Sequence, residues 1–523
     1  MDILIHYNTH SKPINSTFGK QIYKYELGLN EPGYIIYDDE HTVVQRKGND
    51  LCLYVGNVLN IANVDLMNMT PLEMNKLLLG GFLVVRVTNG VVEVITDAMA
   101  NIPAFIYKHG DEILISSRVD WILKSIDRSW SVEWDQFKTF SYSRLMLKNK
   151  TLIKDVTILN YASVYKLSNK TCTIRRYWDP KIGTSNNIVD EFTDTLISVV
   201  DRTFKYVSNP VLSLSAGYDS RLLLAAMLHL GYKPTIGSWG SWNTKRLWYD
   251  NKYPMDIAKS LGLEFVRVSQ DNIHKSLDKD DILTKYSNGF VKHSYYFMIH
   301  YKHELARLGF DVDLTGVGAG LFKPLMCKGD MYKNMNGLKR EYNKHGNKWF
   351  DSLIKPYLDD VPKNINHPGV IDHLRFNFNS YGQWWPRVSF ICRESVRTNL
   401  IYRNIDLMDL SCRVPRSVRD NNNLFKLSIK KLYPKLLDWK FNCDIHKLRS
   451  GAVRTSFCDS SLSKIFNERV SSNESIICGK YSSYKSKHGI NHKTKCKSVF
   501  SYNGCLEYIS NLISEGIKFD GKM

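Results

Sequence analysis

The hydrophobic pattern changes near residue 185, and this change limits the folds open to the chain more than any other feature. Before it, short β-branched runs are separated by tight turns, and after it strand patterns alternate with helical ones. The alternating elements are expected as helices at 190–206, 220–230 and 255–261, and as strands at 211–214, 235–237 and 264–268. Short buried strands that alternate with helices at this spacing are typical of a parallel, doubly wound sheet.

The N-terminal part is predicted to contain successive antiparallel hairpins. The runs 81–87 and 91–95 flank Asn89-Gly90, a dipeptide that favours a two-residue hairpin turn. Similar pairs of runs occur at 104–107 with 112–116, and at 162–167 with 171–177. Several hairpins in a row indicate a layered antiparallel-sheet domain. Together with a polar linker at 183–187, the pattern predicts a first domain at 1–183, a second at 188–450 and a basic C-terminal extension at 451–523.

Composition excludes some classes of protein. Of the 523 residues, 43% are hydrophobic and 24% are charged, which argues against a largely disordered chain. No uncharged apolar run approaches the ~18–20 residues needed to cross a bilayer, and the first residues do not resemble a secretory signal. The ten cysteines are scattered without a CxxC pair, which argues against a zinc ribbon and fits a reducing compartment. We therefore expect a cytoplasmic protein with no membrane partner, and the oligomeric state stays open.

Positive charge is concentrated in the middle of the chain. The net charge is +19, and residues 201–450 hold 39 basic against 24 acidic side chains. A positive potential attracts polyanions, so nucleotide phosphates, an RNA backbone or simple solubility can each explain it. No RNA-binding signature accompanies the basic stretch at 413–440, so phosphates and solubility are favoured over nucleic acid.

One loop contains the residues best suited to chemistry. Leu214-Ser215-Ala216-Gly217-Tyr218-Asp219-Ser220-Arg221 joins a buried strand to a helix. Small residues let the backbone approach a ligand closely, and consecutive amides at a helix N-terminus form an anion-binding concavity. The hydroxyls of Ser215 and Ser220 add donors, and Asp219 is suited to hold a magnesium ion against phosphates. The loop predicts a pyrophosphate-binding site, although a structural turn could have the same composition.

The loop and its neighbours resemble the asparagine synthetase family. Residues 215–220 are similar to the family's Ser-Gly-Gly-x-Asp-Ser loop, and 311–319 resembles its strand ending in Ser-Gly-x-Gly-Ala-Asp-Glu. Residues 97–107 resemble the family's Asp-x-x-Gly-x-x-Pro-Leu-Tyr hairpin, and Tyr177-Trp178 falls where a Tyr-Trp pair closes that domain. The resemblance covers roughly 50–450. It implies an α/β protein in which an N-terminal layered antiparallel-sheet domain, Ntn-hydrolase-like, precedes a doubly wound parallel-sheet pyrophosphate-loop domain, adenine nucleotide α-hydrolase-like.

The resemblance also implies the ligands ATP and Mg²⁺ and a set of site residues. Asp219 and Lys426 match the family's catalytic positions, and Asp219 is the expected metal ligand. Asp250 matches an acidic helix residue, which either contacts the nucleotide or caps the following helix. For each lysine in 423–434, a solvated basic face is favoured over a catalytic role. The expected nucleotide-binding residues are Leu214, Ser215, Ala216, Gly217, Tyr218, Asp219, Ser220, Ile236, Asp250, Thr315 and Gly316.

The sequence departs from the family at two places. Residue 2 is Asp2 rather than the cysteine whose thiolate and own amine hydrolyse glutamine, and the first cysteine is Cys52. The first domain is therefore expected to be a degenerate glutaminase, as in β-lactam synthetases and lasso-peptide cyclases. After Gly318-Ala319 the chain has Gly320-Leu321 where the family has Asp-Glu. That Asp is the family's second magnesium ligand, so its absence puts catalysis in question.

The leading hypothesis is an AMP-forming, ATP-dependent ligase. It would activate a carboxylate as an acyl-adenylate, release pyrophosphate and join the acyl group to an amine. The carboxylate could belong to a small molecule or a peptide, and asparagine synthesis from ammonia is one option. A non-catalytic nucleotide-binding homologue and an RNA-modifying adenylating enzyme are the alternatives.

Overall fold

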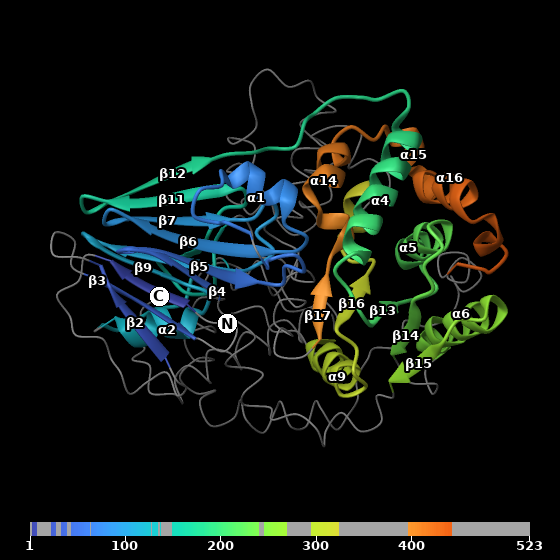
Figure 1. Ribbon diagram of the computed structural model, residues 1–523, viewed down its shortest axis with the longest axis horizontal. Helices are drawn as coiled ribbons and strands as arrows, with labels where there is room; N and C mark the ends of the chain where they lie inside the picture. The colour runs from blue at the N-terminus through green and yellow to red at the C-terminus, as the bar shows by residue number, and fades with distance from the viewer. Residues whose placement is uncertain are drawn as a thin grey trace, which may run out of the picture.

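The computed structural model describes residues 3–7, 22–27, 33–38, 43–62, 64–126, 128–133, 136, 149–239, 245–268, 294–323 and 396–441. Within them the protein is a mixed α/β structure with antiparallel sheets followed by a parallel sheet, as predicted (Figure 1). The predicted extension at 451–523 lies outside the described residues. The boundaries proposed between domains stay a prediction.

Two antiparallel sheets make up the N-terminal part, each six-stranded among the described residues. In spatial order, the first contains β10 (Val156–Ile158), β8 (Phe105–His109), β9 (Glu112–Ser116), β1 (Ile3–Tyr7), β3 (Gly33–Asp38) and β2 (Ile22–Glu26). The second contains β12 (Thr171–Arg176), β11 (Ser163–Ser168), β7 (Val91–Thr96), β6 (Phe82–Thr88), β5 (Asp50–Gly56) and β4 (Val43–Lys47).

The three predicted hairpins are all present, as β6–β7, β8–β9 and β11–β12. Asn89 and Gly90 both have positive φ, 51° and 77°, which matches the twist that a two-residue hairpin turn needs. Asn169 and Lys170 form the equivalent turn at φ of 49° and 59°. The two turn residues of each hairpin therefore set the register in which its strands pair.

Alternating side chains place one core between the two sheets and another outside the second. Leu51, Leu53 and Val55 face the first sheet and pack with residues of β1 and β3. Cys52 and Tyr54, on the opposite side of β5, pack against helix α1 (Pro71–Leu77). This period of two is the direct consequence of strand geometry. A further short helix, α2 (Val119–Ser125), packs on β9.

The parallel sheet follows the linker and includes a reversal of strand order. In space it runs β15 (Phe265–Val268), β14 (Thr235–Trp239), β13 (Pro210–Ser213), β16 (Val312–Thr315) and β17 (Arg397–Asn399), all parallel. The chain moves outward from β13 to β15 and then returns to the other side of β13. In sheets of this kind the crevice outside the carboxyl ends of the two strands at the reversal is the usual ligand site.

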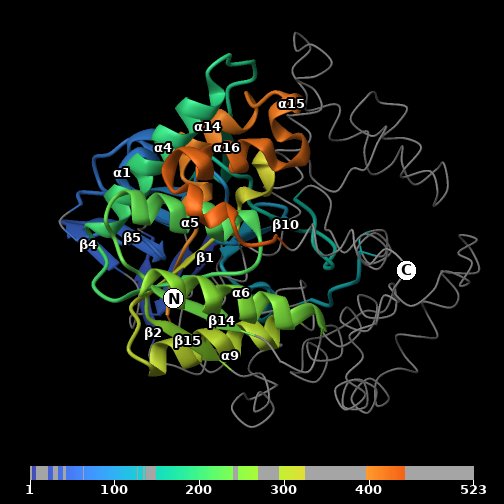
Figure 2. The same cartoon turned by 90° about the vertical axis from the view of Figure 1, so that its right-hand side faces the viewer.

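Helices cover both faces of this sheet. Helices α4 (Ile188–Phe204), α5 (Tyr218–His229) and α6 (Lys245–Leu261) contribute to one core, and α9 (Ser294–Arg307) packs on the opposite face. Figure 2 shows α6 and α9 on either side of β14 and β15. The helix predicted at 255–261 is α6, which begins ten residues earlier and contains Pro254. Proline usually ends a helix, which is why the prediction started after it.

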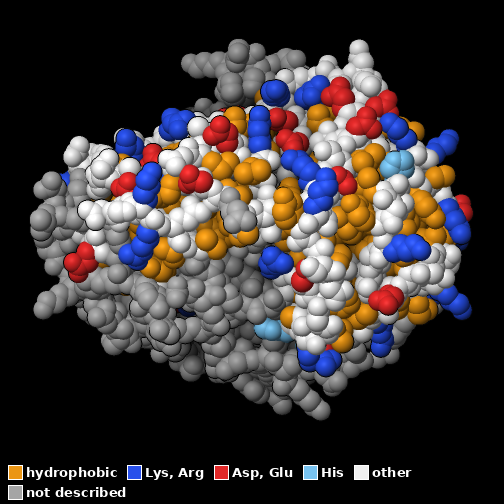
Figure 3. Space-filling model, in the orientation of Figure 1, with side chains coloured by type: hydrophobic (Ala, Val, Ile, Leu, Met, Phe, Trp, Pro, Cys, Tyr) orange, Lys and Arg blue, Asp and Glu red, His pale blue; other side chains and the backbone are white. Residues whose placement is uncertain are grey.

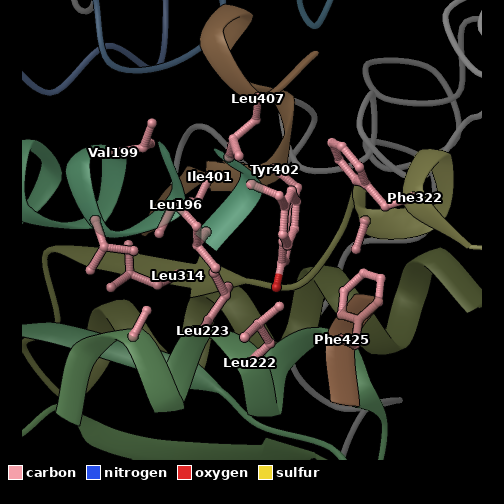
Figure 4. Packing of buried hydrophobic residues seen from close by; sticks show 14 of the residues in the cluster. Leu196, Val199, Leu222, Leu223, Leu314, Phe322, Ile401, Tyr402, Leu407 and Phe425 are labelled. Atoms are coloured by element: carbon pink, nitrogen blue, oxygen red, sulfur yellow. The ribbon is translucent and has the colours of Figure 1, made fainter. Parts of the chain in front are cut away.

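The C-terminal described segment completes the core beside α4 and α5. It contains α14 (Ile405–Ser411), α15 (Arg416–Arg419) and α16 (Asn423–Leu432). Leu196, Leu223, Tyr402 and Phe425 come from four separate segments and meet there, as Figure 4 shows. The site described below therefore rests on a well-packed scaffold.

No helix among the described residues is both long and apolar enough to span a bilayer. On the described part of the face in Figure 3, lysine and arginine side chains are scattered among acidic ones rather than gathered in one patch.

Candidate functional site

The loop 214–217 lies at the strand-order reversal of the parallel sheet. It leaves the carboxyl end of β13 and enters α5 at Tyr218. The neighbouring strand β16 ends at Thr315, and Gly316 then packs directly on the start of α5. The sequence thus folds into the strand–loop–helix predicted for phosphate binding, at the edge of the sheet where ligands bind.

All four backbone amides of the loop 214–217 donate hydrogen bonds within the protein. The Ser215 amide donates to Ser220 Oγ at 3.0 Å, and the Gly217 amide donates to Ser215 Oγ at 3.2 Å. The two hydroxyl oxygens lie 3.2 Å apart. The amide of Leu214 is bonded to the Gly237 carbonyl at 2.9 Å, and its side chain is in the core. These amides are therefore not free to bind a ligand, contrary to what the loop's composition predicted. An anion that bound the amides of Ser215 and Gly217 would have to displace the serine hydroxyl oxygens that now accept their hydrogen bonds.

Asp250 also braces the loop. Its Oδ1 accepts a 3.0 Å hydrogen bond from the buried Ala216 amide. Asp250 lies in the interior of α6, so the expectation that it caps a following helix is wrong. A carboxylate on a loop amide occupies a place that a phosphate oxygen would take. Contact between Asp250 and a nucleotide stays a prediction.

Asp219 is paired with a lysine. The carboxylate contacts the ammonium of Lys323, which follows the short 3-10 helix η2 (Ala319–Phe322) after β16. The Asp219 carbonyl accepts a 2.9 Å hydrogen bond from the Tyr402 hydroxyl. Burial raises the pKa of Tyr402 well above its ordinary value, and the Asp219 charge adds to this, so the hydroxyl stays a donor.

The residues around Asp219 offer few ligands to the expected magnesium ion. Mg²⁺ takes oxygen ligands in a strict octahedron, usually one or two carboxylates with phosphates and water. Within the described ranges, no group of three His, Cys, Asp or Glu side chains could hold a metal. The one carboxylate assigned to the metal, that of Asp219, is already in contact with a cation. In this structure the Asp219 carboxylate is therefore a partner of Lys323, and its assignment as a metal ligand stays a prediction.

The acidic residues in and just before the neighbouring strand β16 do not supply a second carboxylate at the loop. Asp313 is buried and paired with Lys302, while Asp311 accepts hydrogen bonds from the amides of Ser208 and Asn209. Both carboxylates are structural. No acidic side chain of β16 therefore replaces the missing second metal ligand.

Lys426 lies beside Tyr218, the first residue of α5, and its catalytic role stays a prediction. Lys426 is on helix α16, and its Nζ is 5.7 Å from the centre of the Tyr218 ring. The Nζ of Lys323 lies 5.1 Å from the ring centre of Phe425, the residue that precedes Lys426. Two lysines from segments a hundred residues apart thus flank the start of α5. The local sequence indicated Lys426 but gave no signal for Lys323, apart from its position after an altered motif.

Other predicted residues fall inside the scaffold. Ile236 has no exposed surface and lies in the core that β13 and β14 share with the helices. Thr315 is partly exposed at the end of β16. The roles of both residues in nucleotide binding stay predictions.

The N-terminal part shows no activated thiol among its described cysteines. Cys52 is 1% exposed, and burial raises the pKa of its thiol to about 12. Burial also raises the pKa of Cys172. A protonated, buried thiol is inert as a nucleophile. Asp2 lies outside the described residues. The expected absence of glutaminase chemistry stays a prediction.

Replacing Gly316 with alanine is expected to push β16 away from the loop. An added Cβ would lie 2.7 Å from both the Asp219 Cβ and the Ser220 amide nitrogen. Overpacking of this kind costs about 1–3 kcal/mol of unfolding free energy, measurable by urea denaturation. Gly183→Ala is the matched control, because nothing lies within 4 Å of its added Cβ. Equal midpoints for the Gly316→Ala and Gly183→Ala variants would show that strand and loop are farther apart than described.

No family model and no curated protein sequence matches the chain. Solved structures with some likeness include a glutamine phosphoribosylpyrophosphate amidotransferase from B. subtilis complexed with ADP and GMP. Its identity is 10% over 47% of this chain and 54% of that chain, with a TM-score of 0.18. The U34-tRNA thiolase NcsA from Methanococcus maripaludis is 11% identical over 52% of this chain and 86% of its own, with a TM-score of 0.20. NMN synthetase from Francisella tularensis is 12% identical over 51% of this chain and 99% of its own, with a TM-score of 0.20. The chain spans about half the length of the first of these structures, and TM-scores this low do not establish a shared fold or activity.

Proposed function

We propose that the protein binds the phosphates of ATP at the β13–α5 loop and is an AMP-forming, ATP-dependent ligase. The observation that supports this most is the convergence of Lys323 and Lys426 on a strand–loop–helix at the sheet's strand-order reversal. Lysine ammonium groups bind phosphate as point charges and stabilise a departing pyrophosphate. Two lysine ammonium groups beside the loop are not required to stabilise a turn between a strand and a helix.

The reaction proposed for this site has two steps. A carboxylate oxygen of the substrate attacks the α-phosphorus of ATP, and the bond from that phosphorus to the bridging oxygen breaks, so pyrophosphate leaves with the electron pair. An amine then attacks the carbonyl carbon of the acyl-adenylate, AMP leaves, and the amine loses a proton. Lys426 would stabilise the charge on pyrophosphate in the first step. The substrate is a small molecule or a peptide.

Pyrophosphate exchange into ATP tests this proposal, because adenylation is reversible. Exchange is expected to depend on a carboxylate from a panel of amino acids, small acids and peptides. Lys426→Met should slow it about 100-fold or more, the scale for losing one preorganised charge stabiliser. Lys430→Met is the control, since Lys430 is exposed on the same helix.

The alternatives are outcomes of the same measurements. ATP binding without exchange across the panel would favour a non-catalytic nucleotide-binding protein. Tight, salt-sensitive binding of tRNA with exchange only in its presence would favour an RNA-modifying enzyme. Exchange that is unchanged in Lys426→Met would contradict the role given to Lys426.

A further inference from the structure

Lys323 is the cation that lies beside Asp219 in this structure. Its ammonium contacts the Asp219 carboxylate, and its Nζ lies over the ring of Phe425, 5.1 Å from the ring centre. The Lys323 side chain is 21% exposed and that of Asp219 is 32% exposed, so both side chains reach the surface, although the contacting oxygen Oδ1 of Asp219 is buried. An ion pair with both side chains fully buried could not contact a ligand.

The charges argue against adding a metal ion to this pair. A divalent cation on the Asp219 carboxylate would lie within contact distance of the ammonium, and like charges at such distances repel strongly when they are partly shielded from water. Lys426, near Tyr218, adds a further positive charge to the same region. The site already holds the positive charge that phosphates require.

We propose that Lys323 replaces the divalent cation at this loop, so that the site binds the phosphates of a nucleotide, or free pyrophosphate, without a metal ion. This inference rests on the proposed binding of phosphates at the loop. An ammonium has three N–H donors, so one can remain on Asp219 while two reach phosphate oxygens. Asp219 thereby positions the lysine rather than a metal.

Calorimetric titration of the full chain with ATP, and separately with inorganic pyrophosphate, tests the inference. Each titration is done once with excess EDTA and once with excess Mg²⁺. The dissociation constant of the unmodified protein is expected to change less than about threefold between the two conditions, well under the tenfold that 1.4 kcal/mol represents. Lys323→Met should weaken binding in EDTA by about tenfold or more, as expected for a lost charge-assisted hydrogen bond.

Two further variants separate charge from structure. Lys323→Arg keeps the charge and should bind in EDTA within a few-fold of the unmodified protein, whereas Lys435→Met, at an exposed lysine, should not differ from it. Melting temperatures of Asp219→Asn, Lys323→Met and the double variant check folding. They also measure the coupling of the pair without any nucleotide.

The outcomes distinguish the two proposals. Binding that needs Mg²⁺, or that is unchanged in Lys323→Met with EDTA, overturns the role of Lys323 and leaves nucleotide binding intact. Absence of binding in both conditions overturns the proposed function and this inference with it. Metal-independent binding that disappears in Lys323→Met and persists in Lys323→Arg supports both.

Discussion

Replacing Lys302 with methionine is expected to lower the free energy of unfolding by about 3–5 kcal/mol, the scale for removing one partner of a buried ion pair. Lys302 is 3% exposed and its ammonium contacts the carboxylate of Asp313, which is 1% exposed. The substitution keeps most of the side-chain volume but leaves Asp313 as an unpaired charge inside the sheet. Urea denaturation followed by circular dichroism measures the loss.

The pair belongs to a hydrogen-bonded network that joins three strands to α9. Lys302 Nζ also donates to Thr398 Oγ1 on β17 at 2.7 Å. Ser213 Oγ on β13 donates to Asp313 Oδ1 at 2.5 Å and lies 2.9 Å from the Tyr301 hydroxyl. Because Ser213 immediately precedes the loop, this network fixes the end of β13 from below the site. A polar network buried in a sheet is costly when any member is lost.

Two controls separate the unpaired charge from lost packing. The double variant Lys302→Met/Asp313→Leu should be more stable than Lys302→Met alone, because no charge is then left buried without a partner. Lys252→Met removes a half-exposed pair with Asp256, 3.0 Å apart, and should cost no more than about 1 kcal/mol. A double variant as unstable as the single one would mean that packing, and not charge, explains the loss.

The sequence predicted the parts of the fold that depend on neighbouring residues. The hairpin around Asn89-Gly90 and the strand–loop–helix at 211–230 are local, because turn chemistry and side-chain period act over a few positions. Strand β17 has only three residues, Arg397–Asn399, which is too short for a periodic pattern. It joins the sheet through pairing with β16, a contact across about 85 positions that no local pattern encodes.

The sequence predicted where the loop lies in the sheet, but it did not predict the contacts within the loop. Position follows from the rule that loops after parallel strands meet at one edge. Lys323 and Tyr402 reach Asp219 only through tertiary packing, so no spacing near 219 could indicate them. Acceptors on Ser215, Ser220 and Asp250 turned the expected free amides into an internally bonded loop. Such competition between a ligand and local side chains depends on geometry that composition does not contain.

The second large effect is expected at Arg221, which fastens the C-terminal described segment to the loop. Its side chain has no exposed surface. It donates to the carbonyls of Trp439 at 2.7 Å, Lys440 at 3.1 Å and Leu436 at 3.4 Å. The guanidinium lies 3.8 Å from the centre of the Phe441 ring, and that ring stacks on Tyr218 with centroids 3.7 Å apart. Tyr218 thus lies between Phe441, part of this latch (residues 436–441), and Lys426 of α16.

Arg221→Met should lower the free energy of unfolding by about 3 kcal/mol or more, because each hydrogen bond from a charged donor contributes about 1.5–3 kcal/mol. Arg221→Lys should lose part of this, since an ammonium cannot reproduce the planar fork that serves three carbonyls. Arg307→Met is the control, because Arg307 is 68% exposed and pairs only at the surface with Glu304. Hydrogen exchange of 436–441 should quicken in both Arg221 variants. If hydrogen exchange in the latch instead stays slow in Arg221→Met, the stacking of Tyr218 on Phe441 is enough to keep the latch in place. The hydrogen bonds of Arg221 would then not be what fastens the latch.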